Sequence, residues 1–123
     1  MCKILVIDDE KVIINIIQEM LEMYGYDVDT AEDGDEGIEK FDNDSFDLVI
    51  TDIIMPGVDG NSVAKHIRNS GKKYTPVIGM SGTPWTFKGN RFDTIFEKPF
   101  QLKALINTIE ELIPGNSKIA ALG

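Results

Sequence analysis

Five polar side chains lie at the ends of apolar, strand-like runs and have the chemistry to form one site. They are Asp8, Asp9, Asp52, Ser81 and Lys98. A carboxylate at the end of a buried strand is costly unless another group pairs with it. Three carboxylates held together repel by about 4 kcal/mol per pair at about 4 Å in a medium of effective dielectric constant about 20. A hard divalent cation removes this repulsion, and Mg²⁺ suits a site with few carboxylates.

A carboxylate nucleophile, Mg²⁺ and a lysine around one cavity are the groups that phosphoryl transfer requires. The metal and the lysine neutralise charge on the transferring group while the carboxylate attacks in line. A serine hydroxyl can donate and accept a hydrogen bond there. Taken singly, the two N-terminal aspartates could cap a helix, the serine could end a strand and the lysine could be solvated. Polar groups at four strand ends together favour a site.

Strand-like and helix-like segments alternate along the chain. The predicted strands are Lys3–Ile7, Val28–Ala31, Phe46–Thr51, Pro76–Ser81 and Thr94–Glu97. The predicted helices are Lys11–Tyr24, Gly34–Phe41, Asn61–Asn69 and Gln101–Ile113, with at most a turn or two of helix at Pro84–Lys88. This alternation favours an α/β fold with a doubly wound, five-stranded parallel sheet. The second and fifth strands are the least apolar and are placed at the edges. The expected fold is therefore a flavodoxin-like three-layer sandwich of strand order 2-1-3-4-5 with a shortened or irregular fourth helix.

The first predicted helix has a strongly apolar face. The residues predicted to point inward are Val12, Ile13, Ile16, Ile17, Met20 and Leu21. We expect Asp9 to cap the start of this helix and Gly25 to follow its end. Met20 and Met23 are expected to fill the core.

The composition is that of one acidic domain, assigned to residues 1–113 with a C-terminal tail at 114–123. The net charge of −9 argues against a nucleic-acid surface, because phosphate contacts need clustered Lys and Arg, and fits a cation or a basic partner. No apolar run reaches the roughly 20 residues of a membrane helix. Because the start of the sequence has no signal-peptide pattern, we expect the protein to be cytoplasmic. The single cysteine, Cys2, is interpreted as structural, and the single histidine, His66, as a surface residue.

Four motifs, taken in order, resemble the receiver domain of two-component response regulators, the family of the chemotaxis response regulator. They are Ile4–Glu10, Asp52–Gly60, Ser81 and Lys98–Phe100. The resemblance covers Lys3–Ile113. Each motif is modest alone, and together, at strand ends, they are highly specific.

The resemblance implies that Asp52 is phosphorylated by a sensor histidine kinase or a phosphotransfer domain in a reaction that needs Mg²⁺. Direct metal ligands would be Asp9, Asp52 and the backbone carbonyl of Ile54. Asp8 would act mainly through a water bound to the metal.

In the same family, the phosphoryl group is contacted by two further side chains. Ser81 would move to hydrogen-bond it and Lys98 would form an ion pair with it. The peptide bond between Lys98 and Pro99 is typically cis in the family. The domain would then be a phosphorylation switch rather than an enzyme. Its output would be an unknown downstream protein or a tethered domain, with no direct binding to nucleic acid or membrane. The kinase, the output and pairing of two copies stay open.

Two departures from the family pattern favour a non-standard output surface. Ile95 stands three residues before the lysine, where the family usually has an aromatic residue that swings inward when the serine moves. Phe96 points to the opposite face of its strand. The segment Gly82–Asp93 is also shorter than the usual fourth helix and its loop.

A third departure concerns hydrolysis of the phosphorylated state. In the family, the positions of Ile54 and Thr83 flank the path of the hydrolytic water. Because the side chain of Ile54 is apolar and cannot orient a water molecule, we expect slow autodephosphorylation.

Three other classes of protein share parts of this pattern. A Mg²⁺-dependent phosphatase places its nucleophile in Asp-x-Asp-x-Thr after the first strand, where this chain has Asp8-Asp9-Glu10-Lys11. A flavodoxin-like cofactor binder needs a phosphate loop at the same place, where Asp8-Asp9-Glu10 would repel a phosphate in the absence of a metal. The main alternative is a pseudo-receiver, a protein–protein module that works without phosphorylation.

Overall fold

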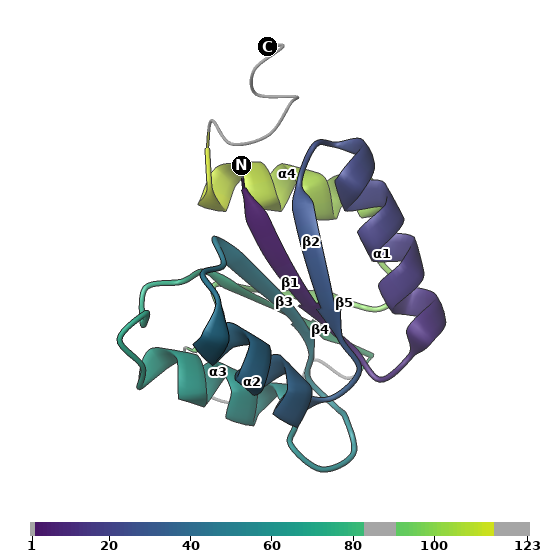
Figure 1. Cartoon of the computed structure of the whole chain (residues 1–123). Helices are drawn as coiled ribbons and strands as arrows, with labels where there is room; N and C mark the ends of the chain where they lie inside the picture. The colour runs from purple at the N-terminus through teal and green to yellow at the C-terminus, as the bar shows by residue number, and fades with distance from the viewer. Residues whose placement is uncertain (1, 83–90, 115–123) are drawn as a thin grey trace.

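The chain folds into a five-stranded parallel sheet with helices on both faces (Figure 1). The computed structural model describes residues 2–82 and 91–114. The strands are β1 (Lys3–Ile7), β2 (Asp27–Ala31), β3 (Leu48–Asp52), β4 (Val77–Ser81) and β5 (Thr94–Glu97). The helices in the described residues are α1 (Lys11–Met23), α2 (Gly34–Asn43), α3 (Gly60–Arg68) and α4 (Leu102–Leu112). The strand order is β2-β1-β3-β4-β5, which confirms the predicted topology.

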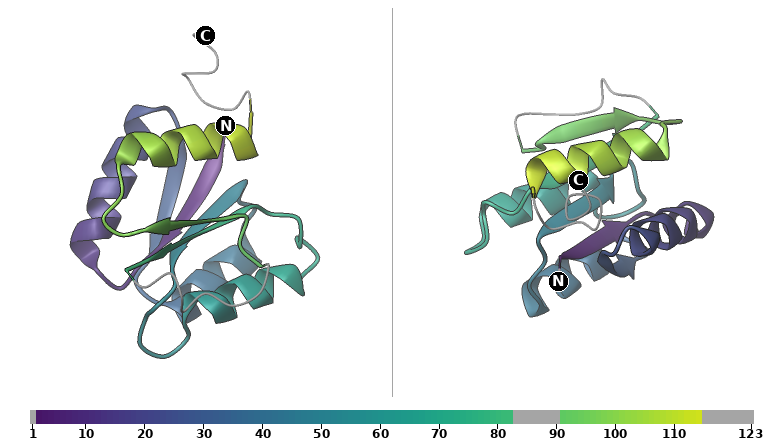
Figure 2. Two further views of the ribbon diagram at one scale, coloured as in Figure 1. Left: turned by 180° about the vertical axis from the view of Figure 1, so that it is seen from behind. Right: turned by 90° about the horizontal axis from the view of Figure 1, so that it is seen from above.

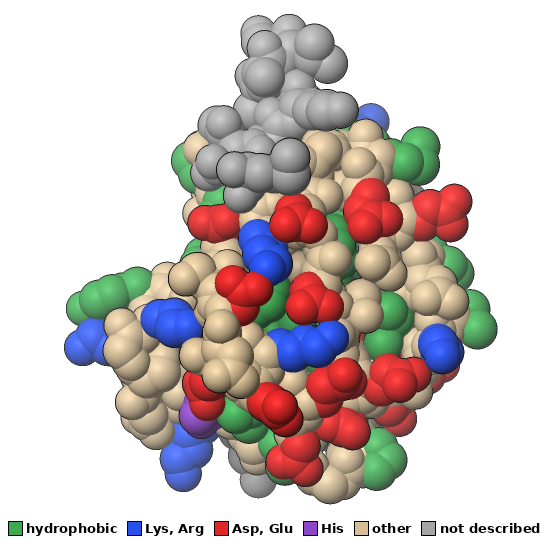
Figure 3. Space-filling model, viewed as in Figure 1, with side chains coloured by type: hydrophobic (Ala, Val, Ile, Leu, Met, Phe, Trp, Pro, Cys, Tyr) green, Lys and Arg blue, Asp and Glu red, His purple; other side chains and the backbone are tan. Residues whose placement is uncertain are grey.

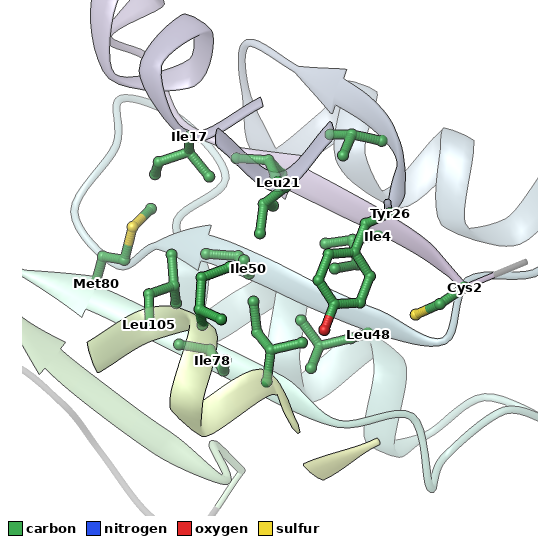
Figure 4. Close-up of a cluster of buried hydrophobic side chains, with 14 residues drawn as sticks. Cys2, Ile4, Ile17, Leu21, Tyr26, Leu48, Ile50, Ile78, Met80 and Leu105 are labelled. Atoms are coloured by element: carbon green, nitrogen blue, oxygen red, sulfur yellow. The ribbon is translucent and has the colours of Figure 1, made fainter. Parts of the chain in front are cut away.

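The sheet separates two hydrophobic clusters, so that the molecule has three layers (Figure 2). Helices α1 and α4 pack on one face and α2 and α3 on the other. Along β1, Ile4 and Val6 point to the α1/α4 cluster, and Leu5 and Ile7 to the α2/α3 cluster. This alternation is the two-residue period of a strand. Figure 4 shows the α1/α4 cluster, in which residues from β1, β3 and β4 face α1 and α4.

The central and edge strands differ in burial as their composition predicts. All residues of β3 and β4 are buried, whereas β2 and β5 contain exposed and half-buried residues. Strands covered by helices on both faces need a continuous apolar sequence, and edge strands do not. The central strands therefore supply a rigid support for whatever follows their carboxyl ends.

The prediction for the inward face of α1 was partly wrong. Ile17 and Leu21 are buried as predicted, together with Ile14, which the prediction omitted. Val12 is 69% and Ile16 is 47% exposed, so both lie outside the core. The cause is that apolar residues extend around α1 beyond one stripe, and periodicity alone does not select the stripe that faces the sheet.

Two details at the ends of α1 also differ from expectation. The N-cap residue is Glu10, and in the described structure no side chain caps this helix, so the predicted capping role of Asp9 was wrong. Met23 is 76% exposed and does not fill the core, whereas Met20 packs partly against it. Gly25 follows the helix with φ of 90°, as expected of a residue after a helix end.

The predicted helical turns at Pro84–Lys88 lie outside the described residues. Within residues 2–82 and 91–114, every helix is too short or too polar to cross a lipid bilayer.

Candidate functional site

The carboxyl ends of four strands bring the predicted polar side chains to one edge of the sheet. Asp52 is the last residue of β3, and Asp8 comes directly after β1. Ser81 ends β4 and pairs in register with Glu97, the last residue of β5. The backbone N–H of Lys98, the next residue, donates to the carbonyl oxygen of Ser81 at 2.8 Å. Parallel strands thus deliver polar residues of distant sequence position to one place, as in other open α/β sheets.

Three carboxylates form the centre of this site. Oxygen atoms of Asp8, Asp9 and Asp52 all lie within 4.8 Å of one another. Asp8 is fully buried and Asp52 is 6% exposed, whereas Asp9 is exposed. Carboxylate oxygens so close together fit a small, hard cation, and one exposed member leaves a path for it to enter. The cluster has the donor set of a Mg²⁺ site.

Lys98 lies against the carboxylates from the side of β5. Its Nζ atom is 3.2 Å from Oδ2 of Asp8 and 3.5 Å from Oδ1 of Asp52. A third carboxylate, Glu10, has its Oε1 atom 3.7 Å from the same nitrogen. The Lys98–Pro99 peptide bond is cis. The lysine therefore compensates part of the negative charge of the site from a fixed position.

Burial and mutual repulsion alter the acidity of these groups. Burial, followed by the charge of Asp8, raises the pKa of Asp52 to about 6 against the opposing effect of Lys98. Burial likewise raises the pKa of Asp8 above its ordinary value. For Lys98, burial acts to lower the pKa, but the charges of Asp8 and Asp52 oppose it and the pKa is raised. The lysine stays protonated, and the buried carboxylates hold their protons more tightly than exposed ones.

The surroundings of the site are also acidic. On the face shown in Figure 3, acidic side chains are spread over the surface, and several lie close together in its lower part. Asp35 and Glu36 belong to the first turn of α2. Such a field attracts cations and repels free anions.

The backbone at Asp52 is held by contacts that the sequence did not reveal. The hydroxyl of Thr51 donates to the carbonyl oxygen of Asp52 at 2.9 Å. The N–H of Ile53 donates to the carbonyl oxygen of Met80 at 2.9 Å, and that of Gly60 to the carbonyl oxygen of Ile53 at 2.8 Å. The only sequence signal for these contacts is the proximity of Thr51 and Gly60 to the Asp52 motif.

Other candidate residues are placed as follows. Ile54 is 54% exposed, so its side chain lies outside the core. Ile95 packs against the α2/α3 cluster and Phe96 against the α1/α4 cluster, which confirms that they face opposite sides of β5. The Nε2 atom of His66 lies 2.8 Å from Oδ1 of Asp42, away from the carboxylates.

Cys2 is confirmed as a structural residue. It is 3% exposed and lies beside Tyr26 at one end of the cluster in Figure 4. Burial, with a smaller effect of Asp47, raises the pKa of its thiol to about 12. Since the thiolate is the reactive form, this thiol is inert at neutral pH.

The chain belongs to the family of response regulator receiver domains, whose model matches residues 4–110. A receiver is a phosphoacceptor signalling module rather than a true enzyme. The predicted resemblance is confirmed, and the three carboxylates correspond to the acidic triad of the receiver Mg²⁺ site.

Curated relatives of similar sequence are transcriptional regulators. The alkaline phosphatase synthesis transcriptional regulatory protein PhoP of Bacillus subtilis is 35% identical over 97% of this chain and 51% of its own length. DltR of Streptococcus agalactiae is 38% identical over 87% of this chain and 50% of its own length. The chain thus spans about half the length of the curated relatives that it matches.

Solved structures of similar fold match over nearly their full length. The response regulator TrrA of Thermotoga maritima, crystallised in complex with Mg²⁺-BeF, has a TM-score of 0.85 and 36% identity, and the match covers 92% of this chain and 100% of that one. The chemotaxis response regulator CheY4 of Vibrio cholerae has a TM-score of 0.84 and 28% identity, covering 92% of this chain and 99% of that one.

Proposed function

We propose that this receiver domain is a phosphorylation switch in which Asp52 accepts a phosphoryl group from a histidine kinase or a phosphotransfer domain. The observation that carries the proposal is the position of Asp52. Its carboxylate is buried at the end of a central strand, within 4.8 Å of the carboxylates of Asp8 and Asp9 and 3.5 Å from the ammonium group of Lys98. These are the groups that an attacking carboxylate needs around a transferring phosphoryl group.

The reaction is a transfer from nitrogen to oxygen. A carboxylate oxygen of Asp52 attacks phosphorus, a new O–P bond forms, and the N–P bond of the phosphohistidine breaks. The electron pair of that bond returns to the imidazole of the donor, which takes up a proton from solvent. Attack requires the ionised carboxylate. With a pKa of about 6, Asp52 is mostly ionised at neutral pH and can act as the nucleophile. Asp9, Asp52 and the backbone carbonyl of Ile54 would hold Mg²⁺ directly, and Asp8 would act mainly through a water bound to it. The bound cation would supply positive charge that neutralises the phosphoryl oxygens.

Phosphorylation would redistribute the contacts of Lys98 and Ser81. A phosphoryl group adds a charge of about −1.5 to −2, and it competes with Asp8 and Asp52 for the ammonium group of Lys98. Ser81 and Lys98 are joined through the backbone, since the N–H of Lys98 donates to the carbonyl of Ser81. A change at either residue therefore reaches the ends of both β4 and β5.

The output surface is proposed to differ from that of most receivers. Ile95 packs against the α2/α3 cluster. It has no ring whose rotation could expose or fill a surface pocket. The same observation favours the second candidate function, a pseudo-receiver that partners recognise in one fixed state.

Amide NMR with beryllofluoride, an analogue of the phosphoryl group, separates the two functions. For a switch, Mg²⁺ with beryllofluoride shifts the amides of Ser81, Lys98 and residues 94–97, and Asp52→Asn abolishes these shifts. For a pseudo-receiver, Mg²⁺ alone and Mg²⁺ with beryllofluoride give the same spectrum. That second result would overturn the proposed switch.

A further inference from the structure

An Asp-Gly pair stands at the start of both α2 and α3, close to the loop that follows Asp52. Asp33 caps α2 by accepting a hydrogen bond from the N–H of Glu36 at 2.8 Å. Asp59 caps α3 in the same way, from the N–H of Ser62 at 2.9 Å. Figure 1 shows the loop between β3 and α3 beside the start of α2, at the carboxyl end of the sheet. The glycine of each pair is the first residue of its helix.

Gly60, the first residue of α3, touches the backbone of Asp52 itself. A Cβ atom at Gly60 would lie 2.3 Å from the carbonyl oxygen of Asp52 and 2.7 Å from Cα of Ile53. The φ angle of Gly60 lies outside the left-handed region, so alanine fits its backbone conformation. Alanine is also the better helix former, by about 1 kcal/mol. Close approach to the Asp52–Ile53 peptide is therefore the feature that requires glycine.

The same peptide is held by two further hydrogen bonds. The hydroxyl of Thr51 donates to the carbonyl oxygen of Asp52, and the N–H of Ile53 donates to the carbonyl oxygen of Met80. The neighbours of Gly60 are backbone atoms, which cannot rotate away as the end of a side chain can. An atom added at Gly60 must therefore move the start of α3 and the Asp52–Ile53 backbone apart.

We propose that Gly60 is a positioning residue of the acidic site, which fixes the Asp52 carboxylate relative to Asp8 and Asp9. The inference rests on the proposed function. Metal sites tolerate deviations of only about 0.2 Å in ligand distance. A misplacement of about 1 Å can slow a reaction between positioned groups by about 100-fold. A contact that sets the backbone of the acceptor therefore controls both metal affinity and transfer.

Two other glycines provide matched controls. A Cβ atom at Gly34 would lie 2.2 Å from the carbonyl oxygen of Val58, an equally severe clash at the far end of the same loop. A Cβ atom at Gly71 would meet no atom of the described structure within 4 Å. Gly34→Ala thus measures the effect of a steric clash in the loop away from Asp52. Gly71→Ala measures the effect of replacing glycine by alanine where there is no clash.

The test is the Mg²⁺ dissociation constant of the folded protein, measured by calorimetry alongside the melting temperature. The phosphorylation rate with acetyl phosphate at saturating Mg²⁺ is measured as well. We expect Gly60→Ala to weaken Mg²⁺ binding by about tenfold or more, and to slow phosphorylation even when Mg²⁺ saturates the site. Gly34→Ala should lower the melting temperature but keep Mg²⁺ affinity within about threefold of wild type, and Gly71→Ala should match wild type in all three measurements.

The inference is overturned if Gly60→Ala binds Mg²⁺ as wild type does, or if Gly34→Ala loses as much affinity. Should Gly60→Ala not fold, Thr51→Val releases the same carbonyl without adding volume, and unchanged Mg²⁺ affinity in that variant overturns the inference. A wild-type protein that binds no Mg²⁺ would instead overturn the proposed function as well, so the two failures are distinguishable.

Discussion

The ammonium nitrogen of Lys98 lies 3.5 Å from the Oδ1 atom of Asp52. In this position the lysine supplies a positive charge beside the carboxylate that we propose to be phosphorylated. It also contacts Asp8, so removing the lysine leaves two buried carboxylates without their nearest positive charge. The same lysine competes with any metal for these oxygens.

Lys98→Met is therefore expected to separate metal binding from transfer. Because a competing positive charge is lost, the variant should bind Mg²⁺ severalfold more tightly than wild type. Because no cation then pairs with the phosphoryl group from that side, phosphorylation should be slower by about tenfold or more. Calorimetry with Mg²⁺ and the rate of phosphorylation by acetyl phosphate measure the two effects. Weaker Mg²⁺ binding in the variant would contradict the claim that Lys98 competes with the metal for the carboxylate oxygens.

The buried Asp52 carboxylate is expected to destabilise the metal-free protein at neutral pH. Its pKa is about 6 in the folded state, above the ordinary value of 3.8. The folded state therefore binds more protons than the unfolded state between these values, and the free energy of unfolding from this group falls as the pH rises through that window. We expect Asp52→Asn to raise the free energy of unfolding by about 2 to 3 kcal/mol above about pH 7, and to change it little near pH 4.

Chemical denaturation at the two pH values, without Mg²⁺, checks this expectation. Glu39→Gln, which neutralises an exposed carboxylate on α2, is the control and should have a small effect at both. Equal stabilisation by Asp52→Asn at both pH values would mean that packing and not charge is responsible.

Mg²⁺ should stabilise the folded protein through the three carboxylates. A ligand that binds only the folded state adds about 2.7 kcal/mol at a concentration 100 times its dissociation constant. We expect the melting temperature to rise with Mg²⁺ and to saturate, and the rise to be lost in Asp9→Asn. Asp35→Asn, outside the triad, should keep it. A rise that KCl of equal ionic strength reproduces would indicate screening of the net charge of −9 rather than a site.

Ile54→Asn should accelerate loss of the phosphoryl group. The side chain of Ile54 is 54% exposed and apolar, so it offers no hydrogen bond to an attacking water. An amide at this position can orient water by donating and accepting hydrogen bonds. The variant is phosphorylated, the phosphoryl donor is removed, and the intact mass is followed over time. The variant should lose its phosphoryl group about tenfold faster than wild type. Ile54→Val keeps the apolar character and should decay as wild type does. An unchanged rate in Ile54→Asn would refute the expectation of slow autodephosphorylation.

Sequence patterns predicted the topology because burial on two faces imposes a simple rule on composition. A strand covered by helices on both sides must be apolar throughout, so the central strands and their polar last residues are visible in the sequence. The meeting of Asp8, Asp52 and Lys98 then follows from parallel topology alone. Their individual roles in phosphorylation stay predictions.

The features that sequence did not predict depend on which neighbour a residue meets. Val12 and Ile16 are apolar, yet they lie outside the core, while Ile14, Ile17 and Leu21 are buried against the sheet. Local propensity does not encode that choice.

The role of Gly60 at the site was likewise not predictable from the sequence. Its spacing from Asp52 marks a turn followed by a helix, but its approach to the Asp52 carbonyl is set by the path of the whole loop.

The most direct test of the proposed function is the intact mass of the protein after incubation with acetyl phosphate, with Mg²⁺ and with EDTA, for wild type and Asp52→Asn. We predict a single phosphoryl adduct on wild type that requires Mg²⁺ and is absent from Asp52→Asn. No adduct on wild-type protein that binds Mg²⁺, or an adduct that persists in Asp52→Asn, would contradict the assignment of Asp52 as the phosphoacceptor.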